Sequence, residues 1–244
     1  IDFGTNRKIL MSKAIPIFIG FDERERVAMN VLIDSLYQNS SKPISITPII
    51  TSQLEKMGFH KRDREEKQST SFSITRFLVP FLMDYEGWAI FMDCDVLCRG
   101  DISKLWDLRD SAYAVMCVKH DFKPKPGLKM DGQIQTVYPR KNWSSVVLWN
   151  CNHPANEKIS VDSVNNPNFD GAYFHRFSWL KDSEIGSLPC DWNWLVGWYK
   201  KEDGVPRAVH YTEGGPWFKN YRDCEFNQHW KKYLHEMMQN TNGY

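Results

Sequence analysis

The sequence predicts an α/β fold with a mostly parallel central sheet and helices on both faces. Three observations indicate it. Residues 15–20 form a short apolar run that ends in glycine, as a buried first strand does. Residues 26–39 carry apolar side chains at the spacing of one helix face. Residues 88–92 are continuously apolar, which is typical of a strand buried on both faces. Strands that alternate with helices in this way build mostly parallel sheets.

Shorter patterns predict the remaining elements. Further strands are expected at residues 43–50, 112–119, 143–149 and 208–211. Further helices are expected at residues 74–85, bent or begun near Pro80, and at 227–238, with loop or partly helical segments at 56–67 and 167–180. No internal repeat or clear linker divides the chain. We therefore expect residues 15–244 to form a single domain, preceded by residues 1–14 as an N-terminal extension, tag or linker.

Length and charge restrict the class of protein. The 244 residues are enough for one domain with a sizeable core. The formal net charge of +1 argues against a general nucleic-acid binder, because phosphate contacts require an excess of Lys and Arg. No apolar run approaches the roughly 20 residues of a membrane span, so peripheral contact is the membrane association left open.

The cysteines predict a reducing environment. They are Cys94, Cys98, Cys117, Cys151, Cys190 and Cys224. They include no C-x-x-C pair, and a chain with a large core does not need a disulfide framework, so we expect free thiols and a cytoplasmic protein. A zinc site from Cys94, Cys98, Cys117 and His120 is an alternative, although its spacing fits no standard zinc module.

Two carboxylates, Asp93 and Asp95, directly follow the apolar run 88–92. Residues i and i+2 of an extended segment point the same way, so both side chains can meet one hard cation. Ligands of α/β sheets bind beyond the carboxyl ends of the strands, where this pair is expected. The alternative is a polar strand end at which Asp caps backbone N–H groups. The pattern thus predicts a divalent metal site with a structural alternative.

Five segments resemble, in order, motifs of glycosyltransferase family 8. Residues 75–80 (TRFLVP) are similar to the R-x-x-x-P helix, and residues 88–97 (WAIFMDCDVL) to the Y-x-D-x-D strand. Residues 142–150 (NWSSVVLWN) resemble F-N-x-G-V-x-x-x-N, residues 188–193 (LPCDWN) resemble L-P-x-x-x-N, and residues 210–217 (HYTEGGPW) resemble H-F-x-G-x-x-K-P-W. The resemblance implies a retaining glycosyltransferase with the GT-A fold, a Rossmann-like nucleotide-diphospho-sugar transferase architecture.

The resemblance also implies site residues. Asp93, Asp95 and His210 would hold Mn²⁺ or Mg²⁺ between the donor phosphates, and Arg76 would pair with the diphosphate or hold the first Asp. Residues 18–22 would border the nucleotide, with Asp22 accepting ribose hydroxyls. The implied catalytic set is Asp93, Asp95, Arg76, Asp191 and Asn193. The implied cofactor-binding set is Phe18, Gly20, Asp22, Arg76, Cys94, Gly214, Gly215 and Lys219.

Each assignment has a structural alternative, and three positions depart from the family pattern. A lone histidine such as His210 is by default a core or surface residue, and Arg76 can be a solvated helix residue. Asp191 and Asn193 are expected near the sugar or acceptor, but they can instead be turn or cap residues. Ser144 stands where the family has Asn, Val146 where it has Gly, and Gly215 where it has Lys, in a segment that is one residue shorter. Lys219 is the candidate replacement for that cation.

The expected function is therefore metal-dependent transfer of a sugar, hexosyltransferase-like, from a nucleotide-diphosphate donor such as a UDP-sugar to a glycan, glycoconjugate or other hydroxyl acceptor, with retention, as in polysaccharide biosynthesis. A nucleotidyl or phosphoryl transferase would use the same paired Asp, but the chain has no Gly-rich phosphate loop. A carbohydrate-binding module is a non-catalytic alternative, against which the helices of the first half argue.

Overall fold

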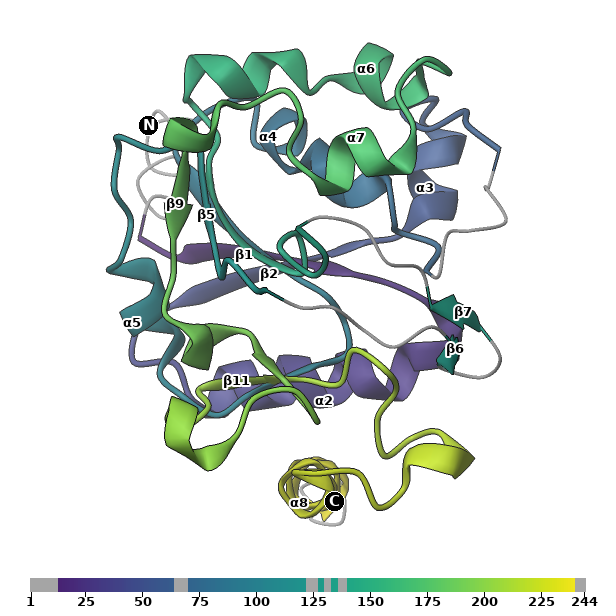
Figure 1. Cartoon of the computed structure of the whole chain (residues 1–244), viewed down its shortest axis with the longest axis vertical. Coiled ribbons are helices and arrows are strands. Elements are labelled where there is room, and N and C mark those ends of the chain that lie inside the picture. Colours follow the sequence, from purple (N-terminus) through teal and green to yellow (C-terminus); the bar gives the residue numbers. More distant parts are fainter. Residues whose placement is uncertain (1–12, 64–69, 122–126, 130–132, 136–139, 240–244) are drawn as a thin grey trace, which may run out of the picture.

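Six strands form the central sheet in the order β2-β1-β3-β8-β5-β9 (Figure 1). The computed structural model describes residues 13–63, 70–121, 127–129, 133–135 and 140–239. The six strands are β1 (Ile15–Gly20), β2 (Ile44–Ile49), β3 (Trp88–Met92), β5 (Val115–Cys117), β8 (Val146–Asn150) and β9 (Ile185–Ser187). The pairs β1–β2, β1–β3 and β5–β9 are parallel, whereas β8 runs antiparallel to both β3 and β5. The mostly parallel sheet is confirmed, with β8 as the exception.

Burial explains which strands lie at the centre. The apolar runs of β1 and β3 are buried almost throughout, and β8 is buried at every residue. In β2 the exposed and half-buried residues alternate, as expected of a strand at the edge of the sheet. Pro48 sits in this edge strand, where a residue without a backbone N–H is tolerated.

Helices cover both faces of the sheet. Figure 1 shows α3, α4, α6 and α7 on one side and α2 on the other, with α8 outside α2. The α-helices are α2 (Arg26–Gln38), α3 (Thr51–Lys56), α4 (Val79–Leu82), α5 (Ile102–Trp106), α6 (Val161–Asn165), α7 (Gly171–His175) and α8 (Asn227–Gln239). Short 3₁₀ helices are η1 (Glu23–Glu25), η2 (Thr75–Leu78), η3 (Pro154–Lys158), η4 (Asp182–Glu184), η5 (Cys190–Trp192), η6 (Lys201–Asp203) and η7 (Lys219–Tyr221).

A second, three-stranded sheet adjoins the first in the order β10-β11-β4. Its strands are β10 (Trp194–Leu195), β11 (Ala208–His210) and β4 (Val96–Cys98), and a separate hairpin joins β6 (Gly127–Lys129) to β7 (Gln133–Gln135). Strand β4 begins directly after the Asp93–Asp95 turn that ends β3. Of this second sheet, the sequence predicted only the strand at 208–211.

The predicted elements agree best where the apolar runs are longest. Strands β1 and β3 have the predicted bounds. The helix expected at 74–85 is divided into η2 and α4, because Pro80 lies in the first turn of α4 and has no N–H to continue η2. The strand expected at 112–119 is reduced to β5, and that expected at 143–149 begins later, as β8. Two parts of the chain lie outside the described residues: residues 1–12 of the expected N-terminal extension, and residues 64–69, which include the end of the expected charged segment.

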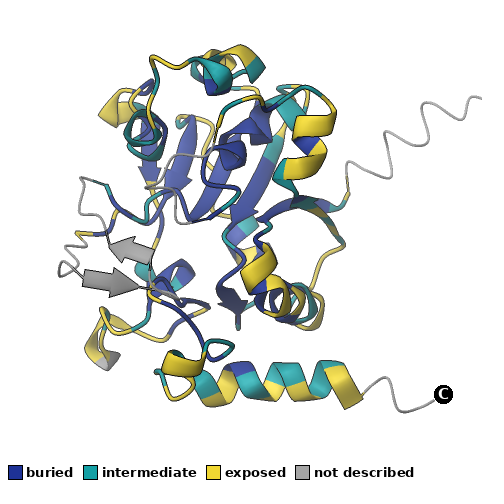
Figure 2. Cartoon of the chain, turned by 90° about the vertical axis from the view of Figure 1, so that its right-hand side faces the viewer, coloured by how far each residue is buried: buried dark blue, intermediate teal, exposed yellow. Residues whose placement is uncertain are grey.

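The core lies between the sheet and the helices (Figure 2). Next to α7 it contains a cluster of fully or largely buried rings, Phe77, Trp149, Phe177 and Trp179, whose centroids lie 5.5 to 6.4 Å apart. Such pairs add to stability beyond the area that they bury. Within the described residues, no helix is both long and apolar enough to span a bilayer.

Candidate active site

Strand pairing brings three candidate metal ligands together at the carboxyl end of β3. The Asp93 N–H donates to the Ser145 carbonyl (2.8 Å), which joins the end of β3 to the start of β8. Strand β11 pairs with β4 so that His210 lies opposite Val96, and the Tyr211 N–H donates to the Asp95 carbonyl (3.0 Å). His210 is therefore placed beside Asp95 by the backbone of the second sheet.

One ligand atom from each of Asp93, Asp95 and His210 lies within 4.8 Å of the others. Across the residues that the structure describes, no other group of three or more His, Cys, Asp or Glu side chains has such geometry. The alternative zinc site from Cys94, Cys98, Cys117 and His120 is thus not formed. Carboxylate oxygens with one imidazole nitrogen suit Mn²⁺ and similar divalent ions.

A buried arginine holds the first Asp. The Arg76 guanidinium donates to the Asp93 carboxylate (2.6 Å) and to the Ser144 carbonyl (3.2 Å). It also lies over the rings of Phe72 and Phe91, 4.8 and 5.3 Å from their centroids. The structure thus shows one of the two contacts expected for Arg76, that with the first Asp.

Carboxyl groups are concentrated around this turn. Burial raises the pKa of Asp93 to about 6, although the adjacent Arg76 acts to lower it. Behind the turn, Glu25 of η1 is 1% exposed and accepts a hydrogen bond from the Cys94 thiol (3.4 Å). Burial and the Asp95 carboxylate raise the pKa of Glu25 well above its ordinary value. Because crowded buried carboxylates ionise readily only beside a cation, these residues fit a divalent ion.

A cavity of about 420 Å³ lies at the carboxyl ends of β1 and β2. It is lined by residues 21–24, 50–52, Glu55, His60, Arg62 and Ser71. In the parallel pair of β1 and β3, Ile19 lies opposite Met92, so the cavity opens at the same edge of the sheet as the Asp93–Asp95 turn. Its size is within the range of small-ligand sites.

Asp22 lies in the wall of this cavity with its carboxylate fully engaged. One oxygen accepts from the backbone N–H and Nε of Arg24, and the other from Arg24 Nη2 and the Ser71 N–H, at 2.8 to 3.0 Å. Burial acts to raise the pKa of Asp22, but these hydrogen bonds outweigh it and the pKa is lowered. A carboxylate has about four acceptor positions, so a ribose hydroxyl could bind Asp22 only by displacing Arg24 or Ser71.

Several residues of the expected nucleotide-binding set have packing roles. Phe18 belongs to the core, and a Cβ on Gly20 would lie 2.1 Å from the buried ring of Phe72. The Cys94 thiol is buried against Glu25. A Cβ on Gly214 would meet Tyr221 at 2.8 Å, and one on Gly215 would meet Trp217 at 2.1 Å. The two glycines therefore permit the tight packing of the segment that follows His210, and Lys219 is exposed at the start of η7.

The two residues expected near the sugar or acceptor are engaged within the protein. The Asp191 carboxylate forms an ion pair with Arg207 (2.9 Å). Asn193 is fully buried, and its side-chain oxygen lies 2.9 Å from His210 Nδ1. The structure thus places Asn193 against His210, one of the proposed metal ligands.

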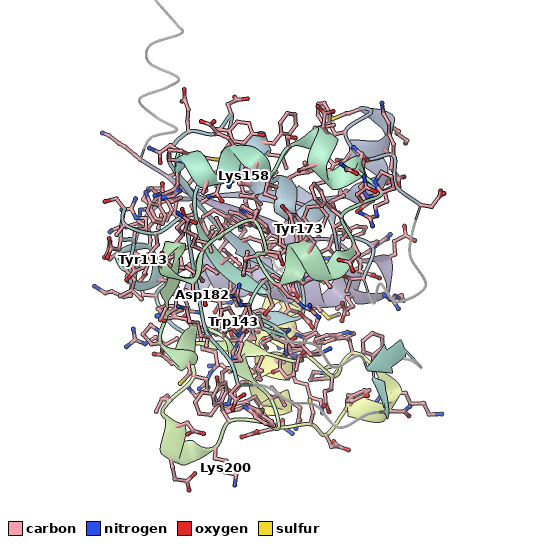
Figure 3. The ribbon with its side chains drawn as sticks, turned by 45° about the horizontal axis from the view of Figure 1, so that its top comes forward. Tyr113, Trp143, Lys158, Tyr173, Asp182 and Lys200 are labelled. Carbon is pink, nitrogen blue, oxygen red and sulfur yellow. The ribbon has the colours of Figure 1, made fainter. Side chains whose placement is uncertain are left out.

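Two other groups at this edge were missed by the sequence analysis. His175 of α7 lies between two hydroxyls, with Nδ1 2.8 Å from Ser144 Oγ and Nε2 3.0 Å from Ser73 Oγ. Trp143, labelled near the centre of Figure 3, donates from its indole to the His120 carbonyl (3.0 Å) and so joins the ends of β5 and β8. No local pattern distinguishes these residues from ordinary core side chains, because their partners are distant in the sequence.

Similarity to known proteins agrees with this architecture. The family model described as glycosyl transferase family 8 matches residues 32–160, more than half of the chain. The chain is 52% identical over 228 residues to "Protein CDI" of Arabidopsis thaliana, covering 92% of this chain and 87% of that protein.

Solved structures share the fold at low identity. The glycosyltransferase GlyE of Streptococcus pneumoniae TIGR4 matches with a TM-score of 0.62 and 16% identity over 94% of this chain, which spans only 64% of GlyE. The galactosyltransferase LgtC, solved with donor and acceptor sugar analogs, matches with a TM-score of 0.54 and 12% identity, over 91% of this chain and 96% of LgtC. The chain is a glycosyltransferase with the GT-A fold, and it belongs to glycosyl transferase family 8.

Proposed function

We propose that this chain transfers a sugar from a UDP-sugar to a hydroxyl of a glycan or glycoconjugate, with retention of anomeric configuration. Asp93, Asp95 and His210 would hold Mn²⁺ or Mg²⁺. The observation that carries the proposal is the convergence of their three ligand atoms within 4.8 Å at the carboxyl end of β3. When bound, a divalent ion stabilises the negative charge that grows on the leaving nucleoside diphosphate.

The chain's own residues prepare this site. Arg76 orients Asp93 through the 2.6 Å contact and counters the effect of burial on its ionisation. Lys219, exposed after the Gly214–Gly215 turn, is proposed to contribute positive charge to the diphosphate. In a retaining transfer, the acceptor oxygen bonds to the anomeric carbon on the face that the diphosphate leaves. The hydroxyl proton then passes to a diphosphate oxygen, so no protein base is required.

The cavity at the ends of β1 and β2 is proposed to hold the nucleoside. Its volume of about 420 Å³ suits a base and ribose, and its position at the same sheet edge as Asp93 and Asp95 suits a donor that reaches both. Phe21 offers an aromatic ring, and Ser52 offers a hydroxyl. With the Asp22 carboxylate already bound by Arg24 and Ser71, we assign Asp22 to shaping the wall of the cavity.

The six cysteines support a proposal about the compartment. All six are free, and four of them are buried. Burial raises the pKa of Cys98, Cys117 and Cys151 to about 12, which keeps these thiols protonated and unreactive. Such thiols are compatible with a reducing environment, and we propose the cytoplasm.

The test of function is release of nucleoside diphosphate from a panel of UDP-, GDP-, CMP- and dTDP-sugars, after a thermal-shift screen with the same donors. We expect UDP release with Mn²⁺, loss of release in EDTA and recovery when Mn²⁺ is restored. Asp95→Asn should abolish release, whereas Asp107→Asn, which alters the exposed ion pair with Lys42, should retain most of it. Turnover in EDTA by metal-free protein would overturn the metal assignment.

A second variant separates the nucleoside cavity from the metal site. Ser52→Trp places an indole in the cavity and leaves Asp93, Asp95 and His210 unchanged. We expect weaker binding of UDP and a raised KM for the donor, with the affinity for Mn²⁺ alone retained. Unchanged UDP affinity would place the nucleoside elsewhere.

A further inference from the structure

We propose that Asn193 is a positioning residue that holds His210 in the tautomer with a free Nε2. Asn193 is fully buried, both polar atoms of its side chain are engaged within the protein, and it acts through the histidine. Its functional meaning rests on the proposed function above, since a metal ligand is needed only if a metal binds. The hydrogen bonds that define the tautomer are present in the protein itself.

The amide of Asn193 can take only one orientation. Its nitrogen lies 3.2 Å from the Asn142 carbonyl and 2.9 Å from Ser145 Oγ. A carbonyl only accepts, so the Asn193 nitrogen must be on this side. The Ser145 hydroxyl donates its own hydrogen to the same Asn142 carbonyl (2.7 Å) and therefore accepts from Asn193. A flipped amide would place two carbonyl oxygens against each other in a buried site.

This orientation decides where the proton of His210 resides. With its nitrogen engaged, Asn193 presents Oδ1 to His210 Nδ1 at 2.9 Å. Because Oδ1 accepts, Nδ1 must carry a hydrogen, and in the neutral ring the lone pair is then on Nε2. Nε2 lies 3.3 Å from Asp95 Oδ1, among the proposed metal ligands. The opposite tautomer would direct an N–H at Asp95 and leave no ring lone pair at the site.

The pairing of strands in the second sheet sets the contact between Asn193 and His210. Asn193 follows η5 and directly precedes β10, which pairs with β11 so that Leu195 lies opposite His210. Asn142, which fixes the amide, has a left-handed backbone (φ 64°) and accepts a hydrogen bond from Thr212 Oγ1 (3.3 Å). Segments before and after His210 are thereby tied to the residue that orients Asn193. Hydrogen-bond partners of ligating histidines commonly change metal affinity 10- to 100-fold when removed.

The direct test is ¹⁵N NMR of the His210 imidazole in metal-free protein, at a pH of about 8.5, which is well above the ordinary histidine pKa of about 6.5. We expect the Nδ1–H tautomer in the wild type. In Asn193→Leu, which has similar volume and no acceptor, Asp95 should draw the proton to Nε2. Asn193→Asp keeps an acceptor for Nδ1–H, and the Ser145 hydroxyl can turn to donate to its other oxygen. This variant should therefore retain the Nδ1–H tautomer, at a cost in stability because the Asn142 carbonyl then faces a carboxylate oxygen.

Calorimetry with Mn²⁺ gives the functional readout. We expect about a 10- to 100-fold loss of affinity in Asn193→Leu and near-wild-type affinity in Asn193→Asp. The matched control is Asn156→Leu, since Asn156 is equally buried and donates to the carbonyls of Ala114 and Asn150, away from His210. It should lose stability without changing the tautomer or the Mn²⁺ affinity.

The outcomes separate this proposal from the proposed function. An Nε2–H tautomer in the wild type, or an unchanged tautomer in Asn193→Leu, overturns the role of Asn193 whether or not Mn²⁺ binds. A wild type that shows the Nδ1–H tautomer but neither binds Mn²⁺ nor releases UDP overturns the proposed function and leaves the positioning of the ring intact. Unaltered Mn²⁺ affinity in a folded Asn193→Leu, with the wild type active, overturns the positioning role alone.

Discussion

Arg76 and Asp93 form a buried ion pair of 2.6 Å whose side chains are 6% and 13% exposed. The guanidinium is also enclosed by the rings of Phe72 and Phe91. The pair therefore joins the 3₁₀ helix η2 to the end of β3 from within the core. Removal of the pair should lower the stability of the whole fold as well as disturb the proposed metal site.

We predict that Arg76→Met lowers the free energy of unfolding of the metal-free protein by about 3–5 kcal/mol, because it leaves a buried carboxylate without its partner. Mn²⁺ should recover part of this loss by compensating Asp93. Urea titrations with and without Mn²⁺ measure both effects. The matched control is Arg207→Met, whose ion pair with Asp191 is half exposed at the arginine and should be worth about 0–1 kcal/mol. Equal losses in the two variants would contradict the prediction.

Asp95→Asn should abolish metal binding without destabilising the fold. The variant removes one negative charge from a turn that also contains Asp93 and lies in front of the buried Glu25, so the metal-free protein should unfold at the wild-type temperature or above it. The increase in melting temperature produced by Mn²⁺ with UDP should disappear. Differential scanning calorimetry measures both. A variant that is still stabilised by Mn²⁺ would exclude Asp95 from the site.

Gly20→Ala should be destabilising through contact with a single ring. The new methyl would lie 2.1 Å from Phe72, which is fully buried and cannot move into solvent. We expect a loss of about 1–3 kcal/mol, as for other overpacked cores. In the double variant Gly20→Ala/Phe72→Leu the smaller side chain makes room, so the two losses should be less than additive. Strict additivity in urea unfolding would show that the strain lies elsewhere.

His120 provides a pH-dependent contribution to stability. Burial lowers the pKa of His120 from 6.5 to about 3, and its Nδ1 lies 2.7 Å from the Tyr199 hydroxyl. Since the folded state holds the ring neutral, this contribution is present above pH 6.5 and is lost as the pH falls towards about 3. Over this window unfolding takes up one proton at His120, which changes the free energy of unfolding by about 1.4 kcal/mol per pH unit.

His120→Gln removes the imidazole that takes up this proton and retains a side chain that can hydrogen-bond to Tyr199. We expect the free energy of unfolding, measured by urea titration between about pH 6 and pH 4, to fall less steeply in the variant by about 1.4 kcal/mol per pH unit. A substitution of the exposed His235 on α8 serves as the control. Parallel pH profiles for wild type and His120→Gln would refute the assignment.

The sequence predicted the parts of the fold that depend on long apolar runs. Strands β1 and β3 could be read directly, and with them the position of Asp93 and Asp95. The second sheet could not, because strands of two or three residues such as β10 and β4 show no periodicity.

At the candidate site too, the sequence did not predict which side chains contact one another. Glu23 and Glu25 look alike in the sequence, yet Glu23 is exposed and Glu25 is buried against Cys94. The resemblance gave Asn193 an expected place near the sugar or acceptor, but its contact with His210 is set by the turn at η5 and the pairing of β10. Side-chain partners set by pairing between distant segments cannot be recovered from local pattern, while motif order still identified His210 as a candidate ligand.

The second sheet also has a consequence for the order in which the chain folds. Strand β4 comes from residues 96–98, whereas β10 and β11 come from residues 194–195 and 208–210, so the pairing of β11 with β4 joins distant segments of the chain. Non-local pairings form late, after the loops between them have closed. During synthesis, β1, β2 and β3 emerge early and can pair, but His210 reaches Asp95 only when β11 has left the ribosome. A nascent or truncated chain would therefore expose an acidic turn without its histidine, and the metal site would be completed among the last steps of maturation.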